Sequence, residues 1–227
     1  MRNLITRTIS GAVMVWLVLE GTAADGIWYY VLWGVIFALS MGEFLWLVAR
    51  KPLANKATWT IGGILYIALA GGVVALMREE WQYLVALLTI VWANDVGAYL
   101  VGISIGKHKM APKISPKKSW EGFFGGLFFA ISVSLVWQIF YFSKAMQIGA
   151  AEINTSLQMI LWGILGLFIG LAAVGGDLLE SAFKRKIGVK DSGKIIPGHG
   201  GMLDRFDALL LALPVFYLII NLINHII

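Results

Sequence analysis

Long apolar runs alternate with short polar stretches along most of the chain. An α-helix needs about 20 apolar residues to cross the hydrocarbon core of a bilayer. Seven runs approach or reach that length, at residues 4–19, 27–49, 57–77, 81–105, 120–142, 157–180 and 208–227. The pattern predicts an all-α, polytopic membrane helical bundle of about seven transmembrane helices, with residues 1–227 forming a single integral membrane domain.

The first run, 4–19, is the shortest, carries Arg7 and is followed by the polar stretch 20–26. An amphipathic helix lying in the membrane interface is therefore an alternative to a spanning helix. A cleaved signal peptide is a third reading, but Ala23-Ala24-Asp25 is a poor cleavage site. We expect the first run to span the membrane and to be retained.

The composition supports a membrane protein, because 59% of the 227 residues are hydrophobic and only 14% are charged. The absence of cysteine excludes disulfides, thiolate metal sites and a thiol nucleophile. The net charge of +5 would suggest a nucleic-acid partner in a soluble protein. In a membrane protein basic residues first report orientation, so we expect no nucleic-acid partner.

The basic residues divide unequally between the two ends of the predicted helices. With the N-terminus in the cytoplasm, 16 of the 18 lysines and arginines lie inside, and only Arg78 and Lys144 lie outside. This division requires the first run to span. It puts the basic loops 106–119 and 182–205 in the cytoplasm and the C-terminus outside.

Asn94 and Asp95 stand inside the run 81–105. A charge at the centre of a spanning helix costs at least about 2.5 kcal/mol, so such residues usually face a water-filled cavity, a partner charge or an ion. A structural hydrogen bond to a neighbouring helix is the alternative. We expect a functional role for Asp95.

A second polar group stands near the end of the run 157–180. Asp177, Glu180, Ser181 and Lys184 share one helical face, because they are spaced by about one and two turns. Asp204 and Asp207 repeat the spacing of three at the start of the last run, and the predicted topology gives Asp177 and this pair the same depth. Converging carboxylates repel one another unless a cation intervenes, and oxygen ligands without cysteine suit Mg²⁺.

Lysines and arginines in the two basic loops favour anionic ligands beside this magnesium site. In the stretch 115–121, Ser119 can serve as the N-cap of the helix that follows. A helix start offers free N–H donors, and Lys117 and Lys118 add positive charge, so a triphosphate would fit. Plain helix capping, and binding of acidic lipid headgroups by the lysines, are the alternatives.

The stretch 181–207 reads SAFKRKIGVKDSGKIIPGHGGMLDRFD and resembles the phosphatidate cytidylyltransferase, or CDP-diacylglycerol synthase, family. The resemblance extends to Asp95 with Gly97 and Tyr99, to SPKKSWEG and to the opening RTISG, whereas 27–86 carries little of it. The residues of the stretch that match the family pattern are Ser181, Lys184, Arg185, Lys190, Asp191, Gly193, His199, Gly200, Gly201, Asp204, Arg205 and Asp207.

The resemblance implies an Mg²⁺-dependent nucleotidyltransferase that transfers CMP from CTP to phosphatidic acid, giving CDP-diacylglycerol and pyrophosphate in phospholipid biosynthesis. It concentrates the catalytic motifs in 92–207. It implies metal ligation by Asp177 and Asp204, with Asp95 as a further ligand and Asp207 nearby. The catalytic residues that it implies are Asp177, Asp204, Asp207, Lys184 and Arg205. It also implies triphosphate binding by Lys117 and Lys118, and lipid-phosphate binding by Lys184, Arg185 and Arg205. Ser115 and Lys190 join the substrate-binding residues, and His199 has a binding or loop-shaping role.

The family also implies a multi-pass protein of a bacterial inner membrane, with its active site facing the cytoplasm. A homodimer, a second metal and a monovalent ion are left open. A CTP-dependent polyprenol or phytol kinase would share helices, metal and nucleotide, but would transfer the γ-phosphoryl group to an alcohol. An ion-coupled transporter is the rival from another class, because buried Asp95 and glycine-interrupted helices also mark ion pathways.

Overall fold

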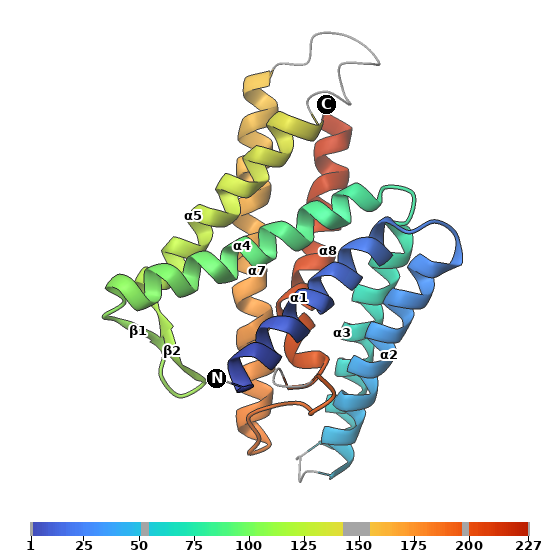
Figure 1. The fold of residues 1–227 in the computed structure, drawn as a ribbon, viewed down its shortest axis with the longest axis vertical. Helices are drawn as coiled ribbons and strands as arrows, with labels where there is room; N and C mark the ends of the chain where they lie inside the picture. The colour runs from blue at the N-terminus through green and yellow to red at the C-terminus, as the bar shows by residue number, and fades with distance from the viewer. Residues whose placement is uncertain (1, 51–54, 143–154, 197–199, 227) are drawn as a thin grey trace. The chain divides into compact units, whose positions relative to one another are not determined.

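The computed structural model describes residues 2–50, 55–142, 155–196 and 200–226, which are almost entirely helical (Figure 1). Its elements are α1 (Arg2–Ala23), α2 (Ile27–Arg50), α3 (Lys56–Leu76), α4 (Trp81–Ile105), β1 (Lys109–Ala111), β2 (Ser115–Ser119), α5 (Trp120–Trp137), the π-helix η1 (Gln138–Phe142), α7 (Thr155–Lys186) and α8 (Leu203–Ile226). Within the described ranges, six helices are long and apolar enough to cross a membrane, and Thr8–Ala23 forms a shorter apolar helix. The chain is a multi-pass integral membrane protein, and the predicted all-α bundle of about seven helices is confirmed. Whether α1 spans the membrane stays a prediction.

Large apolar side chains on the outside of the helices fit a lipid environment. Ile61, Leu65, Leu69 and Leu76 of α3 are all well exposed. In water such a continuous apolar face would be covered by another element, whereas in a bilayer it meets lipid chains.

The chain divides into two compact units. The first unit consists of Met1–Val85 and Leu179–Leu210, and the second of Ala86–Leu178 and Leu211–Ile227. The first therefore holds α1 to α3, the end of α7, the loop after it and the start of α8. The second holds most of α4, the β-hairpin, α5 and the remaining parts of α7 and α8. The single integral membrane domain stays a prediction.

The core of the first unit lies where α2 packs along α3, and the two helices run side by side in Figure 1. The Tyr29 hydroxyl donates a hydrogen bond of 2.6 Å to the Val74 carbonyl oxygen, which ties the start of α2 to the end of α3. The Trp33 ring meets the Phe206 ring edge to face, with centroids 6.2 Å apart. α2 is thus packed against both α3 and α8.

Glycines bring α4 and α5 together in the second unit. A Cβ at Gly122 would lie 2.7 Å from the Ala98 carbonyl oxygen, and one at Gly126 would lie 2.8 Å from that of Asn94. Small residues allow this close backbone approach in membrane helices. The consequence is that α4 holds Asn94 and Asp95 close to the start of α5.

The helices extend beyond the apolar runs and include the polar motifs, as predicted. α7 continues past 180 to Lys186, and α8 begins before 208, at Leu203. The physical reason is that the charged side chains of these turns pair with one another, as described below, so that helical backbone is tolerated there. The β1–β2 hairpin within 106–119 was not predicted at all.

Candidate functional site

A cavity of about 520 Å³ in the second unit brings together the lysines of β2 and the carboxylates of α4 and α7. We call it the lysine–aspartate cavity. It is lined by Asn94, Asp95, Ala98, Tyr99, Gly102, Ile103, Lys109, Met110, Lys117, Lys118, Ser119, Gly122, Phe123, Val174 and Asp177. Asp95, Lys117, Lys118 and Asp177 were all predicted as site residues, and their convergence is the main feature of this unit.

The β-hairpin and the cap of α5 build one wall of the lysine–aspartate cavity. β1 and β2 pair antiparallel, with Lys109 opposite Ser119. The Ser119 hydroxyl oxygen accepts a hydrogen bond of 3.2 Å from the Gly122 backbone N–H, so the predicted N-cap is confirmed. Because β2 ends directly at this cap, Lys117 and Lys118 are held beside the first turn of α5.

The Lys118 Nζ lies 2.5 Å from Asp177 Oδ2, and both side chains are partly exposed. This ion pair joins β2 to α7 within the second unit. The paired charges neutralise each other while remaining accessible to ligands in the cavity. Either charge could therefore exchange its protein partner for a substrate or an ion.

Asn94 is a fully buried polar residue of this cavity. It has no exposed surface, and neither its Oδ1 nor its Nδ2 has a hydrogen-bond partner among the described residues. A Cβ added at Gly126 would lie 2.8 Å from its Oδ1. Since unpaired buried polar groups are costly, the amide fits a role in holding a ligand or water.

The donor set of the cavity fits an oxygen-preferring divalent cation. Asp95 and Asp177 contribute carboxylates, and Asn94 contributes a carbonyl oxygen. Among the described residues, no three histidine, aspartate or glutamate side chains gather into a complete metal site. Mg²⁺ commonly takes only one or two protein carboxylates and completes its shell with phosphates and water, so the set is sufficient for it.

A second polar group lies in the first unit, where Lys184 sits between Glu180 and Asp204. Its Nζ lies 2.6 Å from Glu180 Oε2 and 2.6 Å from Asp204 Oδ1. The side chains of all three are more than nine-tenths buried. The predicted shared helical face of Glu180 and Lys184 is confirmed, and we call the three residues the carboxylate–lysine cluster.

Asp204 also binds the loop between α7 and α8. Its carboxylate accepts hydrogen bonds from the backbone N–H of Ser192, at 2.9 and 3.0 Å to the two oxygens, and from that of Gly201 at 2.9 Å. With Lys184, these donors occupy both oxygens. Asp177 and Asp204 belong to different units, and the metal they were predicted to share stays a prediction.

Glu43 of α2 was missed by the sequence analysis. Its carboxylate is buried and accepts hydrogen bonds from the Ser192 hydroxyl and from the backbone N–H groups of Met202 and Leu203, all between 2.9 and 3.0 Å. A lone glutamate in an apolar run, as in SMGEFLW, was the one available signal.

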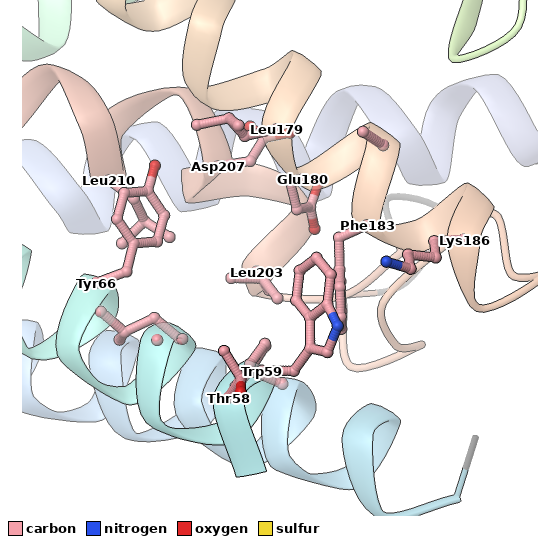
Figure 2. Close-up of a pocket in the computed structure, with 15 residues that line it drawn as sticks. Thr58, Trp59, Tyr66, Leu179, Glu180, Phe183, Lys186, Leu203, Asp207 and Leu210 are labelled. Atoms are coloured by element: carbon pink, nitrogen blue, oxygen red, sulfur yellow. The ribbon is translucent and has the colours of Figure 1, made fainter. Parts of the chain in front are cut away.

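An apolar pocket of about 500 Å³ also lies in the first unit, between α3 and the polar ends of α7 and α8 (Figure 2). Trp59 of α3 lies against Phe183 of α7, with ring centroids 5.4 Å apart, and Lys186 Nζ lies 4.6 Å from the centre of the Trp59 ring. The remaining lining residues are Phe44, Thr58, Gly62, Gly63, Tyr66, Ile67, Leu179, Glu180, Ala182, Leu203, Asp207 and Leu210.

Polar atoms without partners line this pocket. The Tyr66 hydroxyl and Glu180 Oε1 are buried and have no hydrogen-bond partner among the described residues. Asp207, a predicted catalytic residue, lines the same pocket. The pocket is therefore an apolar space with a few polar groups, which is the usual form of a site for an amphipathic ligand.

The remaining predicted substrate-binding residues lie outside both cavities. Arg185, Lys190 and Arg205 are exposed in the first unit, and the Arg185 guanidinium donates a hydrogen bond of 3.1 Å to the Val189 carbonyl oxygen. Ser115 begins β2 and is partly buried. His199 lies outside the described residues. The substrate contacts of these residues stay predictions.

Known proteins resemble this chain in sequence. The profile of a family described as the Cytidylyltransferase family matches residues 73–223. A Staphylococcus epidermidis protein named phosphatidate cytidylyltransferase is 45% identical over 144 residues, which are 63% of this chain and 50% of that protein. Proteins of the same name from Staphylococcus aureus and Staphylococcus saprophyticus are 44% identical over 144 residues and 42% over 142, with the same coverage. The chain spans about half the length of these relatives.

Proposed function

The chain belongs to the cytidylyltransferase family, and we propose that it transfers CMP from CTP to phosphatidic acid, giving CDP-diacylglycerol and pyrophosphate. The observation that carries this proposal is the lysine–aspartate cavity, in which Lys117 and Lys118 lie with Asp95 and Asp177. Cations for a triphosphate and oxygen ligands for a divalent metal are the two requirements of nucleotidyl transfer. The names of the relatives support phosphatidate as the acceptor.

In the proposed reaction a phosphate oxygen of the lipid attacks the α-phosphorus of CTP. A new bond forms between that oxygen and the α-phosphorus, and the bond to the oxygen bridging the α- and β-phosphorus breaks, so that pyrophosphate leaves. The attacking phosphate is already an anion and needs no strong base. The protein's contribution is then positioning and charge neutralisation.

Lys117 and Lys118 would bind the β- and γ-phosphates and stabilise the leaving pyrophosphate. The start of α5 beside them adds a favourable helix dipole. Its Trp120 and Gly122 N–H groups are already bonded, to the His108 carbonyl oxygen and to the Ser119 hydroxyl oxygen. Lys118 must exchange Asp177 for a phosphate oxygen to do so. Nucleotide binding would thereby release the Asp177 carboxylate.

Asp177 and Asp95 would hold Mg²⁺, with Asn94 beside them in the same cavity. A bound Mg²⁺ would supply further neutralisation of the triphosphate charge. A metal role for Asp204 would require its carboxylate to give up Lys184 and the loop N–H groups it now binds. We therefore propose Asp177 and Asp95 as the principal metal ligands.

The apolar pocket would receive hydrocarbon of the lipid substrate. Its aromatic and aliphatic walls lie in helices long enough to span a membrane, and Lys186 adds a cation suited to an anionic headgroup. Each buried CH₂ group contributes about 0.8 kcal/mol. Lys184 was predicted to bind the lipid phosphate, but it forms ion pairs with Glu180 and Asp204. Lys186 is therefore better placed than Lys184 to bind the lipid phosphate.

The 16 to 2 division of basic residues supports a cytoplasmic N-terminus and cytoplasmic basic loops. In a bacterium the membrane would be the inner membrane, where CTP is available from the cytoplasm. A homodimer, a second metal and a monovalent ion stay open.

The position of a phosphorus label tests the reaction. Purified protein with Mg²⁺, phosphatidate and CTP labelled at the α-phosphorus is expected to give labelled lipid, whereas γ-label is expected in pyrophosphate. A CTP-dependent lipid kinase would give the reverse result with an alcohol acceptor. Entry of γ-label into the lipid, or no labelled lipid with either substrate, would contradict the proposal.

A further inference from the structure

Glu43 is a buried carboxylate within a spanning helix. Glu43 lies in α2 and is only 8% exposed. Among the described residues, no lysine or arginine forms an ion pair with its carboxylate. Burying an unpaired charge costs several kcal/mol, which only strong hydrogen bonds can offset. Its hydrogen-bond donors therefore explain how this position tolerates a carboxylate.

All three donors belong to the segment that follows α7. Oε2 accepts from the Ser192 hydroxyl at 2.9 Å and from the Leu203 N–H at 2.9 Å, and Oε1 accepts from the Met202 N–H at 3.0 Å. We call the described residues of the loop between α7 and α8, 187–196 and 200–202, the motif loop. Glu43 thus binds the loop at Ser192 and again where the loop enters α8.

Two glycines leave space for the Glu43 carboxylate. A Cβ at Gly193 would collide with Oε1 of Glu43, and a Cβ at Gly201 would collide with Oε2. The backbone of the motif loop is therefore shaped around this side chain from both sides. The positions of these two glycines therefore indicate, as the hydrogen bonds do, that Glu43 is the side chain against which the motif loop packs.

Ser192 is the point where two carboxylates meet the loop. Its hydroxyl donates to Glu43 and its backbone N–H donates to Asp204, and only 1% of the residue is exposed. Its neighbours Lys190 and Lys194 are exposed. Holding Ser192 inward therefore leaves these lysines at the surface.

We propose that Glu43 is a positioning residue for the motif loop and acts on the reaction through Lys190. It lies outside residues 73–223, which the family profile matches, so the loop of the family pattern is completed by a side chain from outside the match. The anchoring rests on the structure alone. Its effect on CTP use rests on the function proposed above and on the substrate-binding role that the family resemblance implies for Lys190.

Hydrogen exchange measured by mass spectrometry tests the anchoring without any substrate. In Glu43→Gln the amide retains the size of the side chain, but its NH₂ group faces at least one of the three donors. Losing hydrogen bonds to a charged group predicts exchange at Met202 and Leu203, whose N–H groups bind Glu43, that is faster by about tenfold or more. Ser192→Ala removes one bond and should give a smaller change in the same amides. Ser40→Ala is the matched control, because Ser40 is also buried in α2 and its hydroxyl donates a hydrogen bond to the Ile36 carbonyl oxygen of its own helix.

A double-mutant cycle tests the effect on the reaction. Glu43→Gln is expected to lower kcat/KM for CTP about tenfold or more, and Lys190→Gln should lower it as well. If Glu43 acts through Lys190, Glu43→Gln has little further effect in the Lys190→Gln background. A stability change alone would lower activity equally in both backgrounds.

Unchanged exchange in the motif loop of Glu43→Gln and Ser192→Ala would overturn the anchoring. Equal losses of kcat/KM in both backgrounds would overturn the positioning role. If Glu43→Gln does not fold, the same exchange measurement and cycle with Ser192→Ala decide the question. Wild-type protein that transfers no CMP would contradict the proposed function, while the exchange result would still decide the anchoring.

Discussion

Lys118 of β2 and Asp177 of α7 neutralise each other across the lysine–aspartate cavity, with 2.5 Å between Nζ and Oδ2. An incoming triphosphate attracts the lysine, and a divalent cation attracts the carboxylate. The triphosphate and the cation also attract each other. They can therefore bind together, the triphosphate to Lys118 and the cation to Asp177, when the ion pair opens. Nucleotide and metal should therefore bind with positive coupling.

Asp177→Asn should lower kcat at least about 100-fold, because the variant keeps the shape of the side chain but loses the charge that would hold the metal. Steady-state kinetics at several Mg²⁺ concentrations check this. Asp25→Asn is the control, because Asp25 is exposed and its partner Arg78 lies outside the cavity. Near-normal turnover of Asp177→Asn at ordinary Mg²⁺ would contradict the metal role.

Lys118→Gln should raise the KM for CTP about tenfold, because one cation for the triphosphate is lost. Lys113→Gln is the matched control, since Lys113 is exposed in the turn of the same hairpin and does not line the cavity. Nucleotide titration by calorimetry, with and without Mg²⁺, checks the binding directly. Equal affinities for the two variants would exclude Lys118 from the nucleotide site.

Gly62→Leu should raise the KM for phosphatidate about tenfold and leave the KM for CTP unchanged, because the new side chain would fill part of the apolar pocket. A Cβ at Gly62 meets nothing within 4 Å, so the backbone of α3 is not displaced. Gly72→Leu is the control, since Gly72 is equally open on the same helix but lies outside the pocket. If both variants behave alike, the lipid binds elsewhere.

Asp204→Asn should destabilise the protein by roughly 3 kcal/mol, because Lys184 stays buried with one carboxylate partner fewer. The melting temperature in detergent, followed by circular dichroism, measures the loss. Asp191→Asn, at an exposed position in the motif loop, should melt as the wild type does. Unchanged melting with lost turnover would instead favour a direct role of Asp204 in the reaction.

Reporter fusions test the orientation. A fusion after Ile227 should report the outside, and a reporter inserted in 107–118 should report the cytoplasm, because basic residues concentrate in the predicted cytoplasmic loops. A further reporter at the N-terminus decides whether α1 spans, because the two other positions both lie after α1. A cytoplasmic signal from the C-terminal fusion would contradict the predicted orientation.

Features that depend on neighbours in the sequence could be predicted. The Ser119 cap and the pairing of Glu180 with Lys184 follow from spacings of three and four along a helix. The long apolar runs similarly predicted the spanning helices.

Features that depend on distant pairing could not be predicted. Lys184 and Asp204 are 20 positions apart in the sequence, and Ser192 and Glu43 are 149 positions apart. At such separations the helical repeat does not predict which residues come into contact. The β-hairpin was missed for a different reason. β2 contains Pro116 and two adjacent lysines, without the alternation of apolar and polar residues that marks a strand.

The hydrogen bonds of Glu43 also determine where this protein can be divided. A fragment cut at the start of the family match, residue 73, would keep the motif loop, α7 and α8 but lose α2 and most of α3. Ser192, Met202 and Leu203 would then face a gap in place of a carboxylate, and the pocket would lose Trp59 and Tyr66. Such a fragment carries every family motif after residue 73 but lacks the groups that hold the last of them in shape. Transplanting the motif region into another membrane scaffold would therefore require α2 and α3 to be carried with it.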